Sequence, residues 1–181
     1  MSTSENTFVL TVGETEGHCP IGEIVGQKNS ESKKIPVFSC EGACIRGEIA
    51  RRAANLVAKN DPYRRGCHGE LITVPKSAIA AWSLTAEKAI LIDGCFLRCH
   101  GRIMENLFDK DKLIQFDALS HYKKYNEIFD MDEVPEEEKR AVATSVADWV
   151  LKSLQGLEKG EPIATTPSTC SSSCCGQQKM T

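Results

Sequence analysis

Residues 89–99 read Ala-Ile-Leu-Ile-Asp-Gly-Cys-Phe-Leu-Arg-Cys. The first four are a continuous apolar run bounded by charge and glycine, which is typical of a strand buried on both faces of a sheet. A helical pattern follows over residues 96–107. The segment therefore predicts a buried strand that leads through Asp93 and Gly94 into a helix.

The chain shows the same strand-to-helix pattern upstream. A β-rich run at residues 35–39 leads into Cys40 and Cys44, and apolar residues then recur at helical spacing. In both units three residues separate two cysteines, and in the later unit these are Cys95 and Cys99. If the two strands are parallel, both cysteine pairs lie at the same edge of the sheet.

Further segments complete the predicted fold. Residues 113–116 read as a strand, and residues 76–86 carry apolar residues in helical register. Pro135, followed by three glutamates, predicts the start of a last helix, because proline and acids favour that position. The alternation predicts a small three-layer α/β fold with a mostly parallel sheet. The cysteine site is expected at the carboxyl ends of the strands, where such folds bind ligands.

Composition divides the chain into three parts. Residues 1–34 are polar and rich in Gly, Ser, Glu and Lys, and we interpret them as a weakly ordered arm with room for one strand. Residues 35–157 are expected to form one α/β domain, which the cysteines discussed below make a metal-binding domain. Residues 158–181 are predicted to be a disordered tail, because bulky apolar residues are scarce there. The tail nevertheless carries three thiols, Cys170, Cys174 and Cys175.

Charge and cysteine content narrow the function. The 181-residue chain has a formal net charge of -3, so no general attraction to nucleic acid or to anionic membranes is expected. Its apolar runs are too short to span a bilayer, and its N-terminus lacks the basic and apolar regions of a secretory signal. We therefore expect a cytoplasmic, reducing location. There, nine cysteines favour metal or redox chemistry over structural disulfides, and a metal ion is the expected partner.

The cysteines are placed for thiolate chemistry. Residues four apart on a helix share one face, so each pair is able to direct two sulfurs to one ion. Since a helix N-terminus favours negative charge, we expect Cys40 and Cys95 to be stabilised as thiolates. Cys67, in a glycine-flanked loop, returns to the same edge in this interpretation. Together with Cys99 these residues would complete a four-sulfur tetrahedron around zinc.

Other side chains near these cysteines are additional candidates. Cys44 is either a further ligand or a spare thiol. His68 and His100 each directly follow one of the cysteines, so each is a possible ligand, an outer hydrogen-bond donor or a surface residue. Asp93 ends its strand, where it caps the following helix or orients a metal ligand from behind.

These motifs resemble the DGC-domain family of zinc-binding proteins, which is named after the Asp-Gly-Cys at residues 93–95 here. The similarity covers roughly residues 35–155. It rests on Cys40-Glu41-Gly42 before a helix, on Cys67 in its glycine-containing loop, and on residues 89–99. Membership would make the chain a zinc-binding α/β protein. The resemblance implies four metal-ligating cysteines, which fall on Cys40, Cys67, Cys95 and Cys99.

The chain also departs from the family pattern. Glu41 stands where the family leads us to expect serine, and Cys44 is an extra thiol. We favour a zinc-binding protein with a cysteine-thiolate site, and lean against an enzyme; a site closed by four cysteines would be structural, although a position at the strand ends is more typical of ligand binding. Three alternatives use the same cysteines: a thiol redox or metalloid-handling protein, an iron–sulfur protein, and a metal carrier or sensor whose tail delivers the ion.

Overall fold

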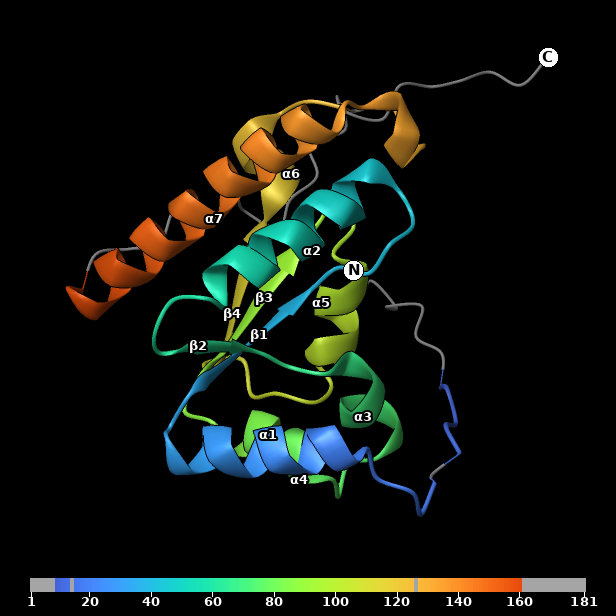
Figure 1. The fold of residues 1–181 in the computed structure, drawn as a ribbon, viewed down its shortest axis with the longest axis vertical. Helices are drawn as coiled ribbons and strands as arrows, with labels where there is room; N and C mark the ends of the chain where they lie inside the picture. Colours follow the sequence, from blue (N-terminus) through green and yellow to red (C-terminus); the bar gives the residue numbers. More distant parts are fainter. Residues whose placement is uncertain (1–8, 14, 126, 161–181) are drawn as a thin grey trace, which may run out of the picture.

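The computed structural model describes residues 9–13, 15–125 and 127–160. At its centre lies a sheet in the order β2-β1-β3-β4, in which every pairing is parallel (Figure 1). The strands are β1 (Ile35–Ser39), β2 (Tyr63–Arg65), β3 (Ala89–Asp93) and β4 (Leu113–Asp117). The predicted α/β class with a parallel sheet is confirmed.

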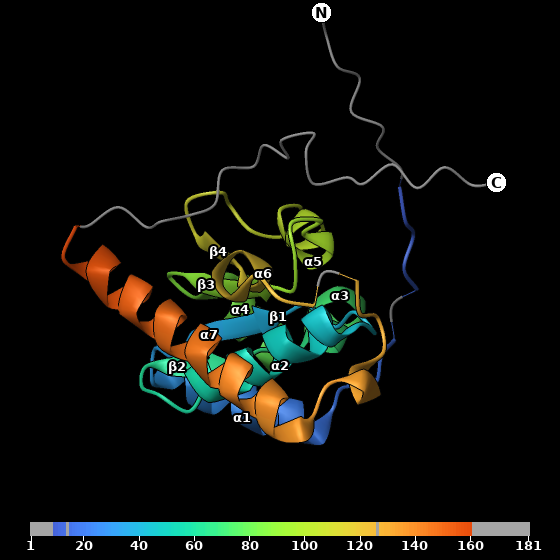
Figure 2. The ribbon, with the colours of Figure 1, turned by 90° about the horizontal axis from the view of Figure 1, so that it is seen from above.

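Helices cover both faces of the sheet, which gives three layers (Figures 1 and 2). One face is covered by α2 (Ile45–Val57), α6 (Ala118–Tyr122) and α7 (Glu136–Glu158). The other is covered by α3 (His68–Thr73), α4 (Ala78–Thr85) and α5 (Cys99–Met104). Outside these lie α1 (Pro20–Glu31), which packs against α4, and the short 3-10 helix η1 (Met131–Glu133). The expected three-layer arrangement is confirmed.

Strand β3 is the most buried strand of the sheet, and all five of its residues are buried. Ile90 and Ile92 pack into the core beneath α2 and α7, whereas Leu91 packs into the core beneath α3, α4 and α5. This alternation follows from the two-residue period of a strand. It places Asp93, two residues after Leu91, on the side of the sheet that carries α5.

The connections diverge at the centre of the sheet. After β1 the chain crosses through α2 to the edge strand β2, whereas after β3 it crosses through α5 to the opposite edge strand β4. The two helices lie on opposite faces. The carboxyl ends of β1 and β3 therefore form a topological switch point, the usual ligand position in open parallel sheets.

The arm predicted at the N-terminus contains a helix, α1. Its buried side consists of small or polar residues, Gly22, Gly26 and Asn29, whereas Ile21 and Ile24 are exposed. An apolar periodicity of the kind that indicates amphipathic helices is therefore missing, because the helix packs through closely approaching backbone. Proline at its first position and Cys19 at its N-cap fix the start.

The structure describes the C-terminal part of the chain as far as residue 160. The end of the predicted domain, at residue 157, falls within the last turn of α7. Residues 161–181, including Cys170, Cys174 and Cys175, lie outside the described residues. Within the described part, no helix combines the length and the apolar character needed to cross a membrane.

Candidate metal centre

Cys40 and Asp93 lie next to each other at the switch point. Cys40 directly follows β1, and Asp93 is the last residue of β3. The backbone N–H of Cys40 donates to the carbonyl of Ile92 (2.9 Å), which continues the ladder between these strands by one step. Two adjacent strand ends therefore hold both side chains, and the sheet fixes their separation.

His100 reaches the same place from α5. A Cβ atom at Gly101 would lie 2.8 Å from Asp93 Oδ2 and 2.5 Å from Gln115 Oε1, so a glycine lets the helix start this close to the strand ends without displacing those side chains. Arg98 precedes α5 in the left-handed conformation (φ 48°), and its guanidinium donates to Gln115 and Glu105. These contacts anchor the first turn of α5, in which His100 is the second residue.

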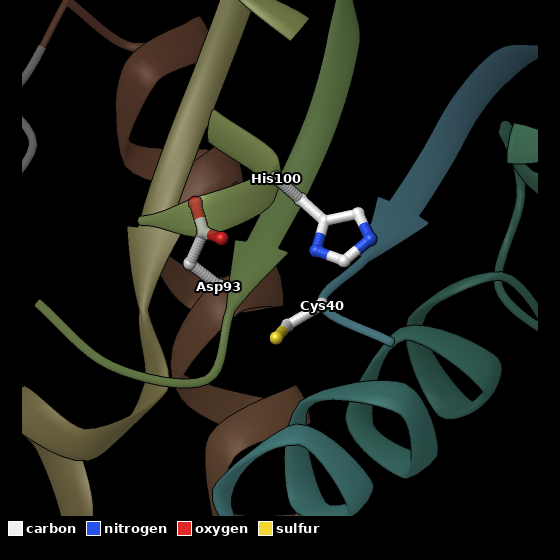
Figure 3. Close-up of side chains that lie close together, drawn as sticks. All are labelled: Cys40, Asp93 and His100. Atoms are coloured by element: carbon white, nitrogen blue, oxygen red, sulfur yellow. The ribbon is translucent and has the colours of Figure 1, made fainter. Parts of the chain in front are cut away.

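The three side chains converge in Figure 3. One ligand atom each from Cys40, Asp93 and His100 lies within 4.8 Å of the other two. Asp93 is 1% exposed, and the other two residues are half-buried. A thiol, a carboxylate and an imidazole at such separations match the donor types and spacing of a mononuclear metal site.

The carboxylate and imidazole atoms of this group are unpaired within the described residues, whereas Cys40 Sγ accepts from the backbone N–H of Gly42 (3.4 Å). Both carboxylate oxygens of Asp93 and Nδ1 of His100 are buried, and none of them has a hydrogen-bond partner among the described residues. A buried polar atom left unpaired costs about 1–3 kcal/mol, and more if it is charged, so native structures rarely tolerate several together. A bound cation would satisfy all three atoms at once.

Burial raises the pKa of Asp93 above its ordinary value. The backbone N–H of Gly101, the charges of His100 and Arg98, and the backbone N–H of His100 oppose this shift without cancelling it. The two N–H groups face the carboxylate but do not meet hydrogen-bond geometry with it. The site thus disfavours an uncompensated carboxylate charge, and a divalent cation is the kind of neighbour that reverses such a preference.

A second histidine lies behind the first. The rings of His68 and His100 are 5.0 Å apart between centroids, edge to face, and His68 Nε2 is buried without a hydrogen-bond partner among the described residues. Burial, followed by the charges of His100 and Arg65, lowers the pKa of His68 to about 3. His68 is therefore neutral at physiological pH, in the form that accepts hydrogen bonds or binds metals.

The four cysteines predicted as ligands share one edge of the sheet, but they do not form one cluster with the atoms above. Cys40 belongs to the three-residue group, while within the described residues Cys67, Cys95 and Cys99 fall outside it. Cys67 occupies the N-cap position of α3 without a side-chain capping bond, Cys95 lies in the turn after β3, and Cys99 is exposed at the start of α5. The four-sulfur site remains a prediction.

The helices after the two cysteine strands begin later than the sequence suggested. Cys44 is the N-cap of α2, and α5 starts at Cys99. The members of each Cys-x3-Cys pair therefore do not share a helix face. Cys95 also differs from expectation, because burial raises its pKa, although the Leu97 backbone and the charge of Arg46 oppose the rise. The helix terminus expected to stabilise its thiolate begins four residues further on.

The geometry gives prominence to two residues that the sequence placed in minor roles. Asp93 was expected as a cap or an outer carboxylate, and His100 was one of several additional candidates. The available signal was the polar residue ending an otherwise apolar strand, since a buried aspartate there needs a partner. Nothing in the spacing of Asp93 and His100 indicated that the turn between them folds back.

Most of this fold falls within the match to a known domain family. The sequence profile of the DGC domain matches residues 36–146, more than half of the chain. The chain belongs to the DGC domain family. In this DGC protein the matched region runs from β1 into α7 and includes Cys40, Asp93 and His100. No curated protein and no solved structure matches the chain.

Proposed function

We propose that this DGC protein binds one Zn²⁺ ion through Cys40, Asp93 and His100 at the switch point of its sheet. The main support is the convergence of the Cys40 thiol with the Asp93 carboxylate and a His100 nitrogen. The carboxylate oxygens and His100 Nδ1 are buried and have no hydrogen-bond partner among the described residues. Sulfur, nitrogen and oxygen donors together suit zinc better than the harder ions magnesium and calcium. The match to the DGC family is consistent with this assignment.

Three protein ligands leave one tetrahedral position for another ligand. Structural zinc sites are closed by four protein ligands, whereas sites with three keep a position for water or substrate. His68 is the residue that we assign to contact the ligand in that position, because its ring lies 5.0 Å from that of His100 between centroids and its buried Nε2 has no hydrogen-bond partner among the described residues. The proposal thus moves from a closed structural site towards an open one, with zinc available for binding or transfer.

Cobalt substitution tests the donor set directly. Co²⁺ replaces Zn²⁺ in such sites, and each thiolate ligand adds charge-transfer absorbance in the near ultraviolet. The three-residue site predicts one equivalent of metal and the intensity of a single thiolate. Cys40→Ser should abolish that band. Cys99→Ser, a matched change at the exposed cysteine that begins α5, should preserve it.

Other outcomes would replace the proposal. Absorbance of four thiolates that falls stepwise in Cys67→Ser, Cys95→Ser and Cys99→Ser would establish the four-cysteine site instead. Brown protein that contains iron and sulfide would indicate a cluster, which four thiolates bind. Protein that takes up no metal in reducing buffer, with Cys40 forming a disulfide in air, would favour thiol redox chemistry.

A further inference from the structure

A second group of side chains flanks the Asp-Gly-Cys turn from the opposite side. Arg46 is the second residue of α2, and a Cβ atom at Gly94 would lie 2.8 Å from the Arg46 carbonyl oxygen. This contact places α2 directly against the turn. Tyr122, at the end of α6, packs against the core beneath α2 and α7, whereas α5 with His100 belongs to the other face.

Two hydrogen-bond donors in this group lack acceptors. Arg46 Nε and Tyr122 Oη are both buried, and neither has a hydrogen-bond partner among residues 9–13, 15–125 and 127–160. Within the same residues Arg46 forms no ion pair with a carboxylate. Arginine keeps its charge at all accessible pH values, so deprotonation cannot relieve this situation. An acceptor that carries negative charge would satisfy both donors.

The neighbours of these donors come from four parts of the chain. Burial raises the pKa of Tyr122, of Asp117 and of Cys95, and the charge of Arg46 opposes each rise, whereas the charge of Cys44 adds to the rise in the pKa of Tyr122. Asp117, at the end of β4, is the nearby carboxylate, but it accepts from the Ser120 backbone N–H (3.4 Å) as the N-cap of α6. Asp117 thus lies within electrostatic range of Arg46 without pairing with it.

We propose that Arg46 and Tyr122 bind a small oxyanion, either a carboxylate or an inorganic oxyanion, on the α2 side of the Asp-Gly-Cys turn. A guanidinium N–H and a phenolic O–H together match two acceptor oxygens of one such group. The position lies across the turn from the Cys40–Asp93–His100 centre and depends on none of those three residues. The protein then holds a metal position and an anion position on the two sides of one turn.

Nitrogen-15 NMR of the arginine side chains tests this on the full chain. Sodium phosphate, sulfate and acetate are titrated separately at constant ionic strength, with chloride as the reference salt. At least one of the three should shift the Arg46 Nε–H resonance saturably, and the tightest of them identifies the class of anion. The Arg140 resonance, from an exposed residue of α7, should not shift.

Variants separate binding from a structural role. In Arg46→Met, the anion concentration that gives half of the rise in melting temperature should be roughly ten- to a hundredfold higher, as expected for the loss of a charge-assisted hydrogen bond. Tyr122→Phe, which removes one buried unpaired hydroxyl, should raise this concentration severalfold and keep the fold. Arg140→Met is the matched control. Zinc content should be unchanged in all three variants, so this test is independent of the metal proposal.

Two results would overturn the anion site. The first is the absence of a saturable shift with all three anions. The second is an anion-dependent rise in melting temperature that is equal in wild type, Arg46→Met and Tyr122→Phe. If Arg46 instead serves Asp117 alone, Arg46→Met and Asp117→Asn will lower the melting temperature equally, whether or not the anions are present.

Discussion

Cys40 and Asp93 stand side by side because the backbone of Cys40 hydrogen-bonds to Ile92, the residue before Asp93 (2.9 Å). One belongs to the end of β1 and the other to the end of β3, although more than fifty positions separate them in the sequence. Their relative position is set by the sheet ladder, which is among the stiffest parts of a fold. Metal binding can therefore be tested by changes that leave this ladder intact.

Asp93→Asn should separate metal binding from folding. The amide has nearly the same shape as the carboxylate but no charge, and burial raises the pKa of Asp93. Metal-free Asp93→Asn should therefore have a free energy of unfolding at pH 7 equal to that of wild type or higher by on the order of 1 kcal/mol. Its zinc affinity should fall by roughly 100-fold or more, beyond the usual effect of an outer ligand partner.

Urea denaturation with a chelator and competition against a zinc indicator give these two quantities. Wild-type zinc affinity in Asp93→Asn would remove the carboxylate from the site. A large loss of metal-free stability would show that Asp93 has a structural partner.

Gly101→Ala should weaken the metal centre through packing alone. The added Cβ atom would meet Asp93 Oδ2 at 2.8 Å and Gln115 Oε1 at 2.5 Å, so either these side chains or the start of α5 must shift. We expect a loss of about 1–3 kcal/mol in stability and a roughly tenfold loss in zinc affinity. Gly69→Ala is the matched control, because its nearest neighbour would be Cys67 Sγ at 3.9 Å, an ordinary contact. Equal effects of the two changes on zinc affinity would contradict the role of Gly101.

Zinc should stabilise the folded chain only while its ligands are present. Free zinc at about 100 times the dissociation constant adds about 2.7 kcal/mol to the free energy of unfolding. Cys40→Ser should lose most of this increase, and Cys99→Ser should retain it. Calorimetric melting with and without zinc measures both. An increase retained in Cys40→Ser and lost in Cys99→Ser would reverse the assignment of the sulfur ligand.

Glu136→Gln should change acid stability in a defined window. Hydrogen bonds from Arg52 of α2 and Lys139, which outweigh slight burial, lower the pKa of Glu136 to about 2 from its ordinary 4.5. A lowered pKa means that this carboxylate stabilises the fold fully above about pH 4.5 and loses that contribution as the pH falls towards 2. The variant should melt below wild type at pH 6 and match it near pH 2.

Melting of the chelated protein across this range provides the measurement, with Glu137→Gln as the control in the same helical turn. Glu137 is exposed and has no ion pair among the described residues. A difference between Glu136→Gln and wild type that stays constant from pH 6 to pH 2 would disprove the linkage.

Gly26→Ala should show how closely α1 packs. A Cβ atom there would fall 2.2 Å from the backbone of Ala78 and Ile79 at the start of α4, where no flexible side chain can yield. We expect a loss of about 1–3 kcal/mol in the free energy of unfolding by urea. Gly13→Ala, with open space around its Cβ position, should change it little. Wild-type stability of Gly26→Ala would mean that α1 shifts freely on α4.

The strands could be predicted where burial leaves a signature in the sequence. Ala89–Asp93 is apolar because both faces of β3 are covered, whereas β2 was missed because Arg64 and Arg65 occupy an edge strand with little apolar character. α1 was missed for a different reason: its contact surface is made of glycines, which carry no hydrophobic signal. The class of fold was therefore readable from sequence, but the helix outside α4 was not.

The cysteines predicted the edge of the sheet at which the candidate site lies, but not the residues that make up the cluster. Cys40 follows its strand as expected. His100 approaches Asp93 because Arg98 adopts a left-handed conformation and Gly101 admits close contact, and both are tertiary effects. Sequence spacing carries no information about such a reversal of the chain. The spacing suggested a set of thiols at this edge, whereas the fold brings together one thiol, one carboxylate and one imidazole.

The short helix α5 has a kinetic consequence for any metal held at this edge. The central strands fix Cys40 and Asp93. His100 instead belongs to a six-residue helix, which is held by hydrogen bonds among Arg98, Gln115 and Glu105. Local opening of such an element requires much less free energy than opening of a central sheet. A bound ion would therefore exchange with solvent at the rate of local opening of α5, while the sheet stays folded. The dwell time of the metal would then be set by the Arg98 contacts, which touch none of its ligands.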